Sequence, residues 1–332
     1  MKVRFAPSPT GSLHIGNALG AVANRNFGGT FLLRIDDTDP ARNVAGGDEQ
    51  AILDDLRWLG IEWDEGPVRQ SERGERYREA AAGLPDRFQG VQLLRPDGSA
   101  TYQLASDVDD IDFGITHVIR GNDHRPNEPL HRALTEALGA TPPEYIHFGL
   151  ILGPDGKKLS KRSDGASVAS LREAGIPPEA VRRYLEELGL PRHDVRLDLA
   201  RIRSLAVDVL AELSDEELAA RLEAPVSVVP ALRGAHDLLE ARELAASILE
   251  RPSVSMPEER PTLERFRELR SAVNGAIDKD AARAIVRELK AVGGNLRAVR
   301  RALTGRDSGP ELWSVVAALP REETLRRIDA AL

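Results

Sequence analysis

The first 152 residues alternate between short apolar runs and segments with helical spacing. Val3 and Phe5 lie in an apolar run that stops at prolines, and residues 18–26 continue with the spacing of a helix. Residues 30–35 are apolar at almost every position, which is typical of a strand buried on both faces of a parallel sheet. This alternation predicts a doubly wound α/β domain with its functional groups at the carboxyl ends of the strands.

The same pattern predicts the other elements of this half. Three amphipathic segments are predicted helices, over residues 48–59, 71–82 and 129–138. Three apolar runs are predicted strands, over residues 91–95, 115–120 and 146–152. Turns are predicted over residues 60–67 and 96–98. The second turn leads into a strand-like segment over 100–105, which is followed by an acidic loop over 106–112. The aspartates of this loop have metal-ligand-like spacing, but the Gly and Glu of a calcium loop are missing, so no metal site is predicted.

Helical patterns replace the strands from residue 167 onward. Segments 168–174, 178–188 and 197–213 show no strand alternation, and Pro177 and Pro191 mark boundaries between them. Ser214 followed by Glu217 is a capping signal for a helix that continues to residue 222. Helical spacing persists to the end of the chain. The sequence therefore predicts an α/β domain followed by an all-α domain.

Composition restricts the class of protein. The 332 residues are 41% hydrophobic and 30% charged, which suits a packed core and a solvated surface. The chain has no cysteine, which excludes disulfides and thiolate metal sites. No basic leader or membrane-length apolar run is visible, so we expect a cytoplasmic protein without a membrane partner. The net charge of −8 argues mildly against nucleic acid, but the last third is locally basic, with Arg283, Arg287, Lys290, Arg297, Arg300, Arg301 and Arg306.

Two segments are candidates for chemistry. Residues 4–17 read as a strand, a tight loop and a helix start, where Gly11 and Gly16 leave room for an anion at the helix N-terminus. An ordinary strand–loop–helix with an exposed His14 would explain the same residues. Residues 153–162 form a Gly-flanked loop with three lysines and one arginine, which alone would read as a solvated charge run.

The two segments together resemble a known family. His14-Ile-Gly-Asn17 and Lys158-Leu-Ser-Lys-Arg162 are similar to the two signatures of class I aminoacyl-tRNA synthetases. Segments 4–11, 34–39, 102–105, 108–110, 117–121 and 152–162 resemble the glutamyl-tRNA synthetase branch, and 296–305 and 309–312 resemble the end of its bacterial anticodon-binding domain. The resemblance implies a Rossmann-type catalytic domain over 1–165, with a shortened connective segment near 83–95, and a helical linker with an anticodon-binding domain over 166–332.

The resemblance also implies an activity. We expect ATP-dependent activation of L-glutamate to glutamyl adenylate and transfer of the glutamyl group to the 3′ end of tRNA. The implied partners are glutamate, ATP with Mg²⁺, and tRNA, with tRNA-Glu as the expected acceptor. The chain is expected to act as a monomer and to need no zinc.

The family's motifs assign roles to individual residues. By resemblance, His14, Lys158 and Lys161 are catalytic. The implied ATP site comprises Ala6, Thr10, His14, Gly16, Asn17, Asp123, Leu159, Ser160 and Lys161. The implied glutamate site comprises Arg4, Ser8, Asp36, Tyr102, Ser106 and Arg120, with Asp36 on the ammonium and Arg120 on the distal carboxylate. A structural salt bridge from Arg120 to Asp110 or Asp123 is the alternative for that arginine.

The chain departs from the family at four places. Asp36 stands where the bacterial enzymes usually have Glu, Ser106 where Asn is common, and residues 163–166 where a His-Gly-Ala run is frequent. The family also inserts a connective subdomain that grips the acceptor end of tRNA, and here about ten residues span the interval 82–91. Amino-acid specificity and the handling of tRNA are therefore the properties most open to change.

Two alternative functions follow from these departures. A paralogue could activate glutamate and transfer it to a modified tRNA base, a carrier protein or a small molecule, which the short connective segment favours. A non-catalytic tRNA-binding protein could have kept the fold. Against the second alternative stand His14, Lys158, Lys161 and Arg120, since binding alone does not require all four.

Overall fold

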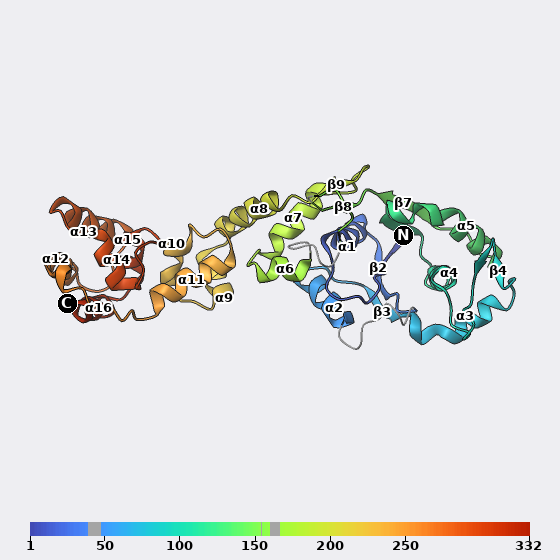
Figure 1. Ribbon diagram of the computed structural model, residues 1–332, viewed down its shortest axis with the longest axis horizontal. Coiled ribbons are helices and arrows are strands. Elements are labelled where there is room, and N and C mark those ends of the chain that lie inside the picture. Colours follow the sequence, from blue (N-terminus) through green and yellow to red (C-terminus); the bar gives the residue numbers. More distant parts are fainter. Residues whose placement is uncertain (39–47, 154, 160–166) are drawn as a thin grey trace. The chain divides into compact units, whose positions relative to one another are not determined.

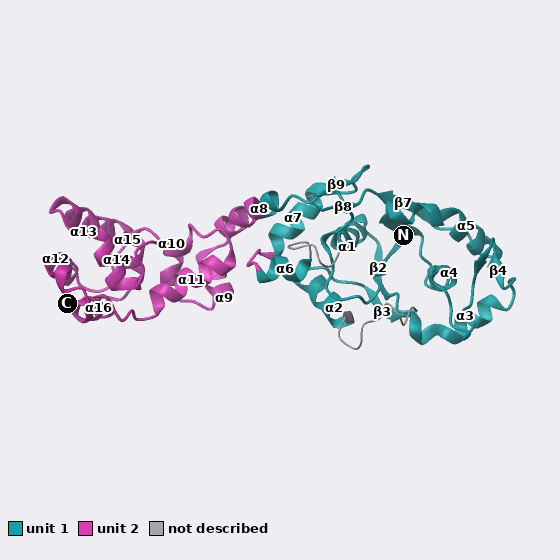
Figure 2. Cartoon of the chain, in the orientation of Figure 1, with its two compact units in different colours: residues 1–173, 178–202 teal, residues 174–177, 203–332 magenta. Residues whose placement is uncertain are grey.

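The computed structural model describes residues 1–38, 48–153, 155–159 and 167–332 (Figure 1). The chain divides into two compact units (Figure 2). Unit 1 comprises residues 1–173 and 178–202, and unit 2 comprises 174–177 and 203–332. Within the described ranges, no helix combines the length and the apolar character that crossing a bilayer requires.

Parallel strands form the centre of unit 1. Strands β1 (Lys2–Phe5), β2 (Thr30–Ile35) and β3 (Glu65–Arg69) form one parallel sheet in that order, and β6 (His117–Gly121) pairs in parallel with β7 (Glu144–Phe148). The backbone N–H of Thr116 donates to the carbonyl of Lys2, so β6 begins beside β1. The carboxyl ends of β1, β2 and β6 therefore face the same edge of the unit.

Helices flank these strands (Figure 1). Helix α1 (Ile15–Phe27) packs against β1, β6 and α7. The other helices of unit 1 are α2 (Asp48–Trp58), α3 (Gly74–Ala81), α4 (Tyr102–Asp112), α5 (Glu128–Ala137), α6 (Val168–Glu173) and α7 (Pro178–Leu188), with short 3₁₀ turns η1 (Gln70–Arg73) and η2 (Asn122–Asn127). The helices predicted over 48–59, 71–82, 129–138, 168–174 and 178–188 are confirmed within a few residues at each end.

The segment 100–112 corrects two predictions. It is neither a strand nor an acidic loop, because Tyr102–Asp112 is helix α4. Leu104 and Val108 pack with Tyr77 and Leu134 in an apolar cluster, at the spacing of one helix face. Asp107, Asp109 and Asp110 are buried. The sequence alone disguises this, because Asp109 and Asp110 find their arginine partners on other elements.

The remaining differences are shorter. Residues 65–67, predicted as part of a turn, begin strand β3. Of the strand predicted over 91–95, Val91–Gln92 forms strand β5, which pairs in antiparallel fashion with β4 (Arg87–Phe88). Leu94 forms an isolated antiparallel bridge with Ala100. The strand predicted over 146–152 is divided between β7 and β8 (Ile151–Leu152), which pairs with β9 (Val195–Arg196).

Unit 2 is helical, as predicted. Helix α8 (Leu199–Glu212) begins in unit 1 and continues into unit 2. The others are α9 (Asp215–Leu222), α10 (Val229–Leu232), α11 (Leu238–Leu249), α12 (Arg260–Ser271), α13 (Lys279–Ala291), α14 (Leu296–Thr304), α15 (Leu312–Ala318) and α16 (Arg321–Ala331), with 3₁₀ turns η3 (Val226–Val228) and η4 (Pro257–Glu259). The predicted capping box is confirmed: Ser214 and Glu217 bind each other's backbone N–H at the start of α9.

Candidate active site

A cavity of about 670 Å³ lies at the carboxyl ends of β1, β2 and β6. The predicted residues that line it are Arg4, Ala6, Ser8, Thr10, His14, Gly16, Asn17, Asp36, Tyr102, Arg120, Asp123, Lys158 and Leu159. Ser106 does not line it. Ser160 and Lys161 fall outside the described residues. The structure therefore gathers most of the predicted glutamate and ATP residues around one space.

The start of α1 forms one end of the cavity. His14 is the N-cap of α1, and its Nδ1 accepts a hydrogen bond of 3.1 Å from the backbone N–H of Asn17. In the neutral imidazole the proton is then on Nε2, which makes that atom a donor. A Cβ on Gly16 would lie 3.1 Å from His14 Nδ1, so glycine gives the ring room over the helix start. The arrangement offers donors to an anion.

A buried aspartate holds the loop before α1. Asp55 Oδ2 accepts hydrogen bonds from the backbone N–H of Leu13 at 2.8 Å and from Ser12 Oγ at 2.6 Å, and Oδ1 pairs with Arg172. Burial raises the pKa of the Asp55 carboxyl. Sequence reasoning missed this role. The available signal was the position of Asp55 on the apolar face of α2, three residues after Ile52.

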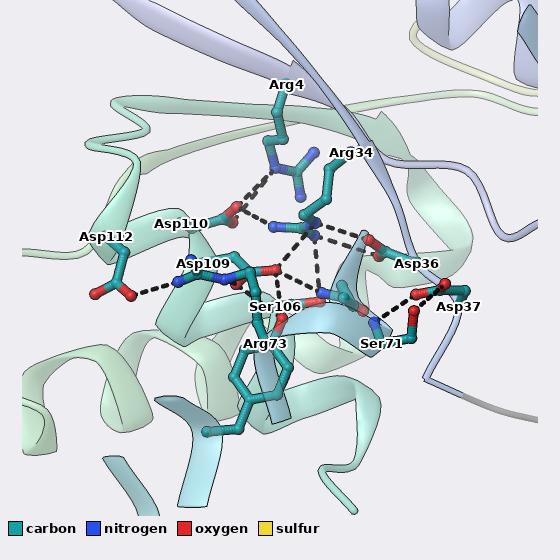
Figure 3. Close-up of polar contacts among 12 residues, drawn as sticks. Arg4, Arg34, Asp36, Asp37, Ser71, Arg73, Ser106, Asp109, Asp110 and Asp112 are labelled. Atoms are coloured by element: carbon teal, nitrogen blue, oxygen red, sulfur yellow. Dashed lines mark hydrogen bonds and ion pairs between the residues drawn. The ribbon is translucent and has the colours of Figure 1, made fainter. Parts of the chain in front are cut away.

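A network of buried charges forms the floor of the other end (Figure 3). Arg34 has 0% of its surface exposed; its Nε lies 2.7 Å from Asp36 Oδ1 and its Nη1 lies 2.8 Å from Asp110 Oδ1. Arg4 Nε lies 3.3 Å from both oxygens of Asp110. Burial acts in the opposite direction, but Arg4 and Arg34 together lower the pKa of Asp110. The network fixes Arg4 and Asp36 where they line the cavity.

Asp109 joins this network to η1 and α3. It accepts hydrogen bonds from Gln70 Nε2 at 2.9 Å, Arg73 Nε at 2.8 Å and the Tyr77 hydroxyl at 2.9 Å. The backbone and hydroxyl of Ser71 bind Asp37, which follows β2 (Figure 3). These contacts fix α4 against the segment that follows β3.

Arg34, Asp109 and Asp110 were quoted in family motifs without a role. The signal that could have found Arg34 is a charged residue inside an otherwise apolar strand. Ser106 lies behind this arginine: it is 2% exposed, and its Oγ lies 3.5 Å from Arg34 Nη2. Its position favours support of Arg34 over contact with a ligand.

Arg120 lines the cavity from the end of β6. Its Nε donates to His147 Nε2 at 3.4 Å, its Nη2 donates to the His124 carbonyl at 3.4 Å, and its guanidinium lies 5.1 Å from the centre of the Tyr145 ring. Over the ranges that the structure describes, no carboxylate forms an ion pair with Arg120. Asp110 and Asp123, the partners considered in the alternative, pair with other cations.

Lys158, from the second signature, lines the end of the cavity nearest that segment. Its side chain is 60% exposed and forms an ion pair with Asp123, which follows β6. Burial opposes the change, but the hydrogen bond from Lys158 lowers the pKa of Asp123. The described part of the chain holds no group of three or more side chains arranged to bind a metal ion.

The arrangement separates two kinds of anion site. Arginines on strands suit carboxylates, because a guanidinium can bind a carboxylate through two parallel hydrogen bonds. A helix N-terminus with a nearby lysine suits phosphates. One cavity could therefore hold a carboxylate-bearing substrate beside a nucleotide.

Comparisons with known proteins agree on a family. The model of the catalytic domain of class I tRNA synthetases for glutamate and glutamine matches residues 1–90 and 84–216, and the model of an anticodon-binding domain matches 238–332. Glutamate–tRNA ligase 2 of Rhodospirillum centenum is 32% identical over 470 residues, covering 99% of this chain and 98% of the relative. Glutamate–tRNA ligase 1 of Rubrobacter xylanophilus is 42% identical over 250 residues, covering 63% of this chain and 58% of the relative.

A solved structure supports the fold. A glutamate tRNA ligase from Elizabethkingia meningosepticum, crystallised in complex with its amino acid, superposes with a TM-score of 0.74 at 22% identity and covers 99% of this chain and 98% of that chain. The predicted fold class, a parallel α/β domain followed by a helical domain, is confirmed. The alignment with the Rhodospirillum relative is longer than this chain, so that relative contains segments that this chain lacks.

Proposed function

The chain belongs to the class I tRNA synthetases for glutamate and glutamine, and on that basis we propose that its cavity joins glutamate and ATP as glutamyl adenylate. Relatives matched over nearly their full length are named glutamate–tRNA ligases, so the family is one of ligases that form aminoacyl-tRNA. The observation that carries the proposal is the single cavity in which Arg4, Asp36 and Arg120 lie with His14 and Lys158.

We place the glutamate at the end lined by the strands. Arg120 is proposed to bind the distal carboxylate, because it lines the cavity and no described carboxylate neutralises it. Asp36 is proposed to accept from the ammonium while Arg34 holds it in place. Each charge-assisted hydrogen bond is worth roughly 1.5–3 kcal/mol. Arg4, Ser8 and Tyr102 complete the proposed site, and Ser106 supports it through Arg34.

ATP is proposed to bind between the start of α1 and Lys158. An oxygen of the α-carboxylate attacks the α-phosphorus, the bond to pyrophosphate breaks, and negative charge grows on the leaving group. His14 Nε2–H and the first N–H groups of α1 would donate to phosphate oxygens, and Lys158 would balance the pyrophosphate charge. Ala6, Thr10, Gly16, Asn17, Asp123 and Leu159 line the same end, and the roles of Ser160 and Lys161 rest on the resemblance.

Mg²⁺ is proposed to enter with the nucleotide. This ion keeps most of its waters and is usually held by phosphates with one or two carboxylates, so a cluster of protein ligands is not needed. Asp123 is the cavity-lining carboxylate beside Lys158 and fits that requirement. Mg²⁺ would supply neutralisation of phosphate charge.

The glutamyl group is proposed to pass from the adenylate to a hydroxyl of the terminal ribose of tRNA, with tRNA-Glu as acceptor; the acyl–phosphate bond breaks and AMP leaves. Support comes from the match of residues 238–332 to an anticodon-binding domain and from the basic residues of the last third. We assign catalysis to residues 1–165 and the linker with tRNA binding to 166–332. We propose that the chain acts as a monomer in the cytoplasm, as the resemblance to the family implies.

Exchange of pyrophosphate into ATP, measured with glutamate in the presence and absence of total tRNA, tests this proposal. We expect glutamate-dependent exchange and acid-precipitable glutamyl-tRNA. Exchange without charged tRNA would favour transfer to another acceptor. The short hairpin of β4 and β5, each two residues long, supports that alternative, because it occupies the place of the family's connective subdomain. Absence of exchange under all conditions would leave a non-catalytic tRNA-binding protein.

A further inference from the structure

The register between β6 and β7 places two aromatic side chains beside Arg120. Arg120 is paired with His147, and Tyr145 lies two residues earlier on the same face of β7. The His147 side chain is 2% exposed, and its ring lies almost parallel to that of Tyr145, at 9° with 6.3 Å between the centroids. A histidine buried beside an arginine needs a reason, because two cations there would repel each other.

The contacts of His147 define its protonation state. Its Nε2 is 3.4 Å from Arg120 Nε, which can only donate, so Nε2 must carry the lone pair. Its Nδ1 is 3.5 Å from Glu128 Oε2, the first residue of α5. Burial and the neighbouring Arg120 lower the pKa of His147, which agrees with a neutral ring. The geometry thus corresponds to the tautomer with its proton on Nδ1, facing Glu128.

A second arginine, Arg132, contacts both Glu128 and the Tyr145 ring. Arg132 of α5 donates from Nε to Glu128 Oε1 at 2.8 Å, and its guanidinium lies 4.9 Å from the Tyr145 ring centre. Arg120 lies 5.1 Å from the centre of the same ring. Contact with an aromatic face favours a stacked guanidinium and restricts its rotation. Glu128, Tyr145 and His147 therefore form a rigid support behind Arg120.

The support leaves one edge of Arg120 for a ligand. His147 occupies Nε, and the His124 carbonyl occupies one N–H of Nη2. Within the described residues no partner binds Nη1. The edge formed by Nη1 and the second N–H of Nη2 is suited to a bidentate carboxylate. The side-chain amide of glutamine has only one acceptor oxygen. Discrimination between glutamate and glutamine therefore depends on how firmly this edge of Arg120 is held in position.

We propose that His147, in its neutral form and with its tautomer fixed by Glu128, is a positioning residue that aims Arg120 at the distal carboxylate and thereby sets the preference for glutamate over glutamine. The proposal rests on the proposed function of Arg120. It adds a residue to which the two signatures and the family motifs gave no role.

The test uses ATP–pyrophosphate exchange by the full chain with glutamate and with glutamine. His147→Leu removes the acceptor, whereas His147→Gln keeps an acceptor oxygen. We expect His147→Leu to raise the KM for glutamate and to reduce the preference for glutamate by about tenfold each, which corresponds to one hydrogen bond to a charged group. The KM for ATP should stay within about twofold, and His147→Gln should restore most of both losses.

Two further variants make the outcome decisive. His117→Leu is the matched control, since His117 lies on β6, pairs with Glu144 at 3.4 Å and is not part of the cavity lining. It should leave both KM values unchanged. Glu128→Leu, at a part-exposed position, should raise the KM for glutamate severalfold, and it tests the proposal even if His147→Leu does not fold.

The possible failures are distinguishable. If the native chain shows no glutamate-dependent exchange, either with or without total tRNA, the proposed function fails and this inference with it. If the native chain prefers glutamate and His147→Leu keeps that preference, the positioning role alone is overturned. Equal losses in the KM for glutamate and ATP, or in His147→Leu and His147→Gln, would indicate a merely structural histidine.

Discussion

The two ends of the cavity are built in different ways. At the end proposed for glutamate, Arg34 is 0% exposed and forms ion pairs with two buried aspartates, Asp36 after β2 and Asp110 on α4. At the end proposed for ATP, Lys158 is 60% exposed and pairs with a single carboxylate. Buried charges cost much to leave unpaired, whereas exposed pairs contribute little to stability. The residues proposed to bind glutamate are thus held by a buried charge network, whereas Lys158 is held by an exposed ion pair.

Removal of Arg34 should produce the largest effect on stability, because this residue lies at the buried end of the cavity. Arg34→Leu leaves Asp36 and Asp110 without their shared partner in the core, and we expect a loss of about 3–5 kcal/mol in the free energy of unfolding. Chemical denaturation measures it. Arg57→Leu, which removes an exposed arginine paired with Asp54, is the control and should change little. A similar small change for both variants would contradict a buried network.

The second effect concerns pH. Asp107 Oδ1 lies 2.8 Å from His131 Nδ1, and burial raises the pKa of Asp107 from 3.8 to about 6. The folded chain then holds a proton that the unfolded chain has lost, so this group removes stability as pH rises through that window. The loss should approach about 3 kcal/mol between pH 4 and pH 7.

Asp107→Asn is the comparison for this prediction, since it keeps an acceptor for His131 without the charge. The difference in unfolding free energy between the two proteins should shift in favour of the variant as pH rises from 4 to 7. A difference that does not vary with pH would show that the carboxylate ionises in the folded state as it does in water.

Lys158→Met tests the exposed end. If Lys158 stabilises charge on pyrophosphate, kcat for exchange should fall by about 10²-fold or more, with little change in the KM for glutamate. The melting temperature should stay close to that of the native chain, because the pair with Asp123 is largely exposed. A rise in the KM for ATP with unchanged kcat would instead assign Lys158 to ground-state binding.

Gly16→Ala gives the smallest expected change. The added Cβ would lie 3.1 Å from His14 Nδ1 and displace the ring slightly, while alanine favours the helix by roughly 0.5–1 kcal/mol. We therefore expect a severalfold rise in the KM for ATP with equal or slightly higher stability. An unchanged KM for ATP would remove the His14 ring from the nucleotide site.

The comparison also explains what could be predicted from sequence. The helix start at residue 14, the end of the strand at Arg120 and the charged loop at Lys158 each follow a short local pattern. Their roles were assigned through the resemblance of the two signatures and the other motifs to a known family. Their grouping around one cavity follows from the parallel strands. Local patterns of this kind predict single elements, but not contacts between residues that are distant in sequence.

The buried network could not be predicted in the same way. Segment 106–112 was misread as a loop because its aspartates look solvated, and their partners Arg4, Arg34 and Arg73 are distant in sequence. The role of Asp55 was missed for the same reason, because its partners Ser12, Leu13 and Arg172 are also distant in sequence. The role proposed for His147 depends on the register between β6 and β7, which sequence pattern alone does not fix.

The most direct measurement of the central claim is ATP–pyrophosphate exchange by the native chain with each of the twenty amino acids in turn. The account predicts exchange with glutamate, and a much lower kcat/KM with glutamine, because Arg120 presents donors suited to a carboxylate. Exchange with glutamine at least as efficient as with glutamate, or with an amino acid lacking a side-chain carboxylate, would contradict the account.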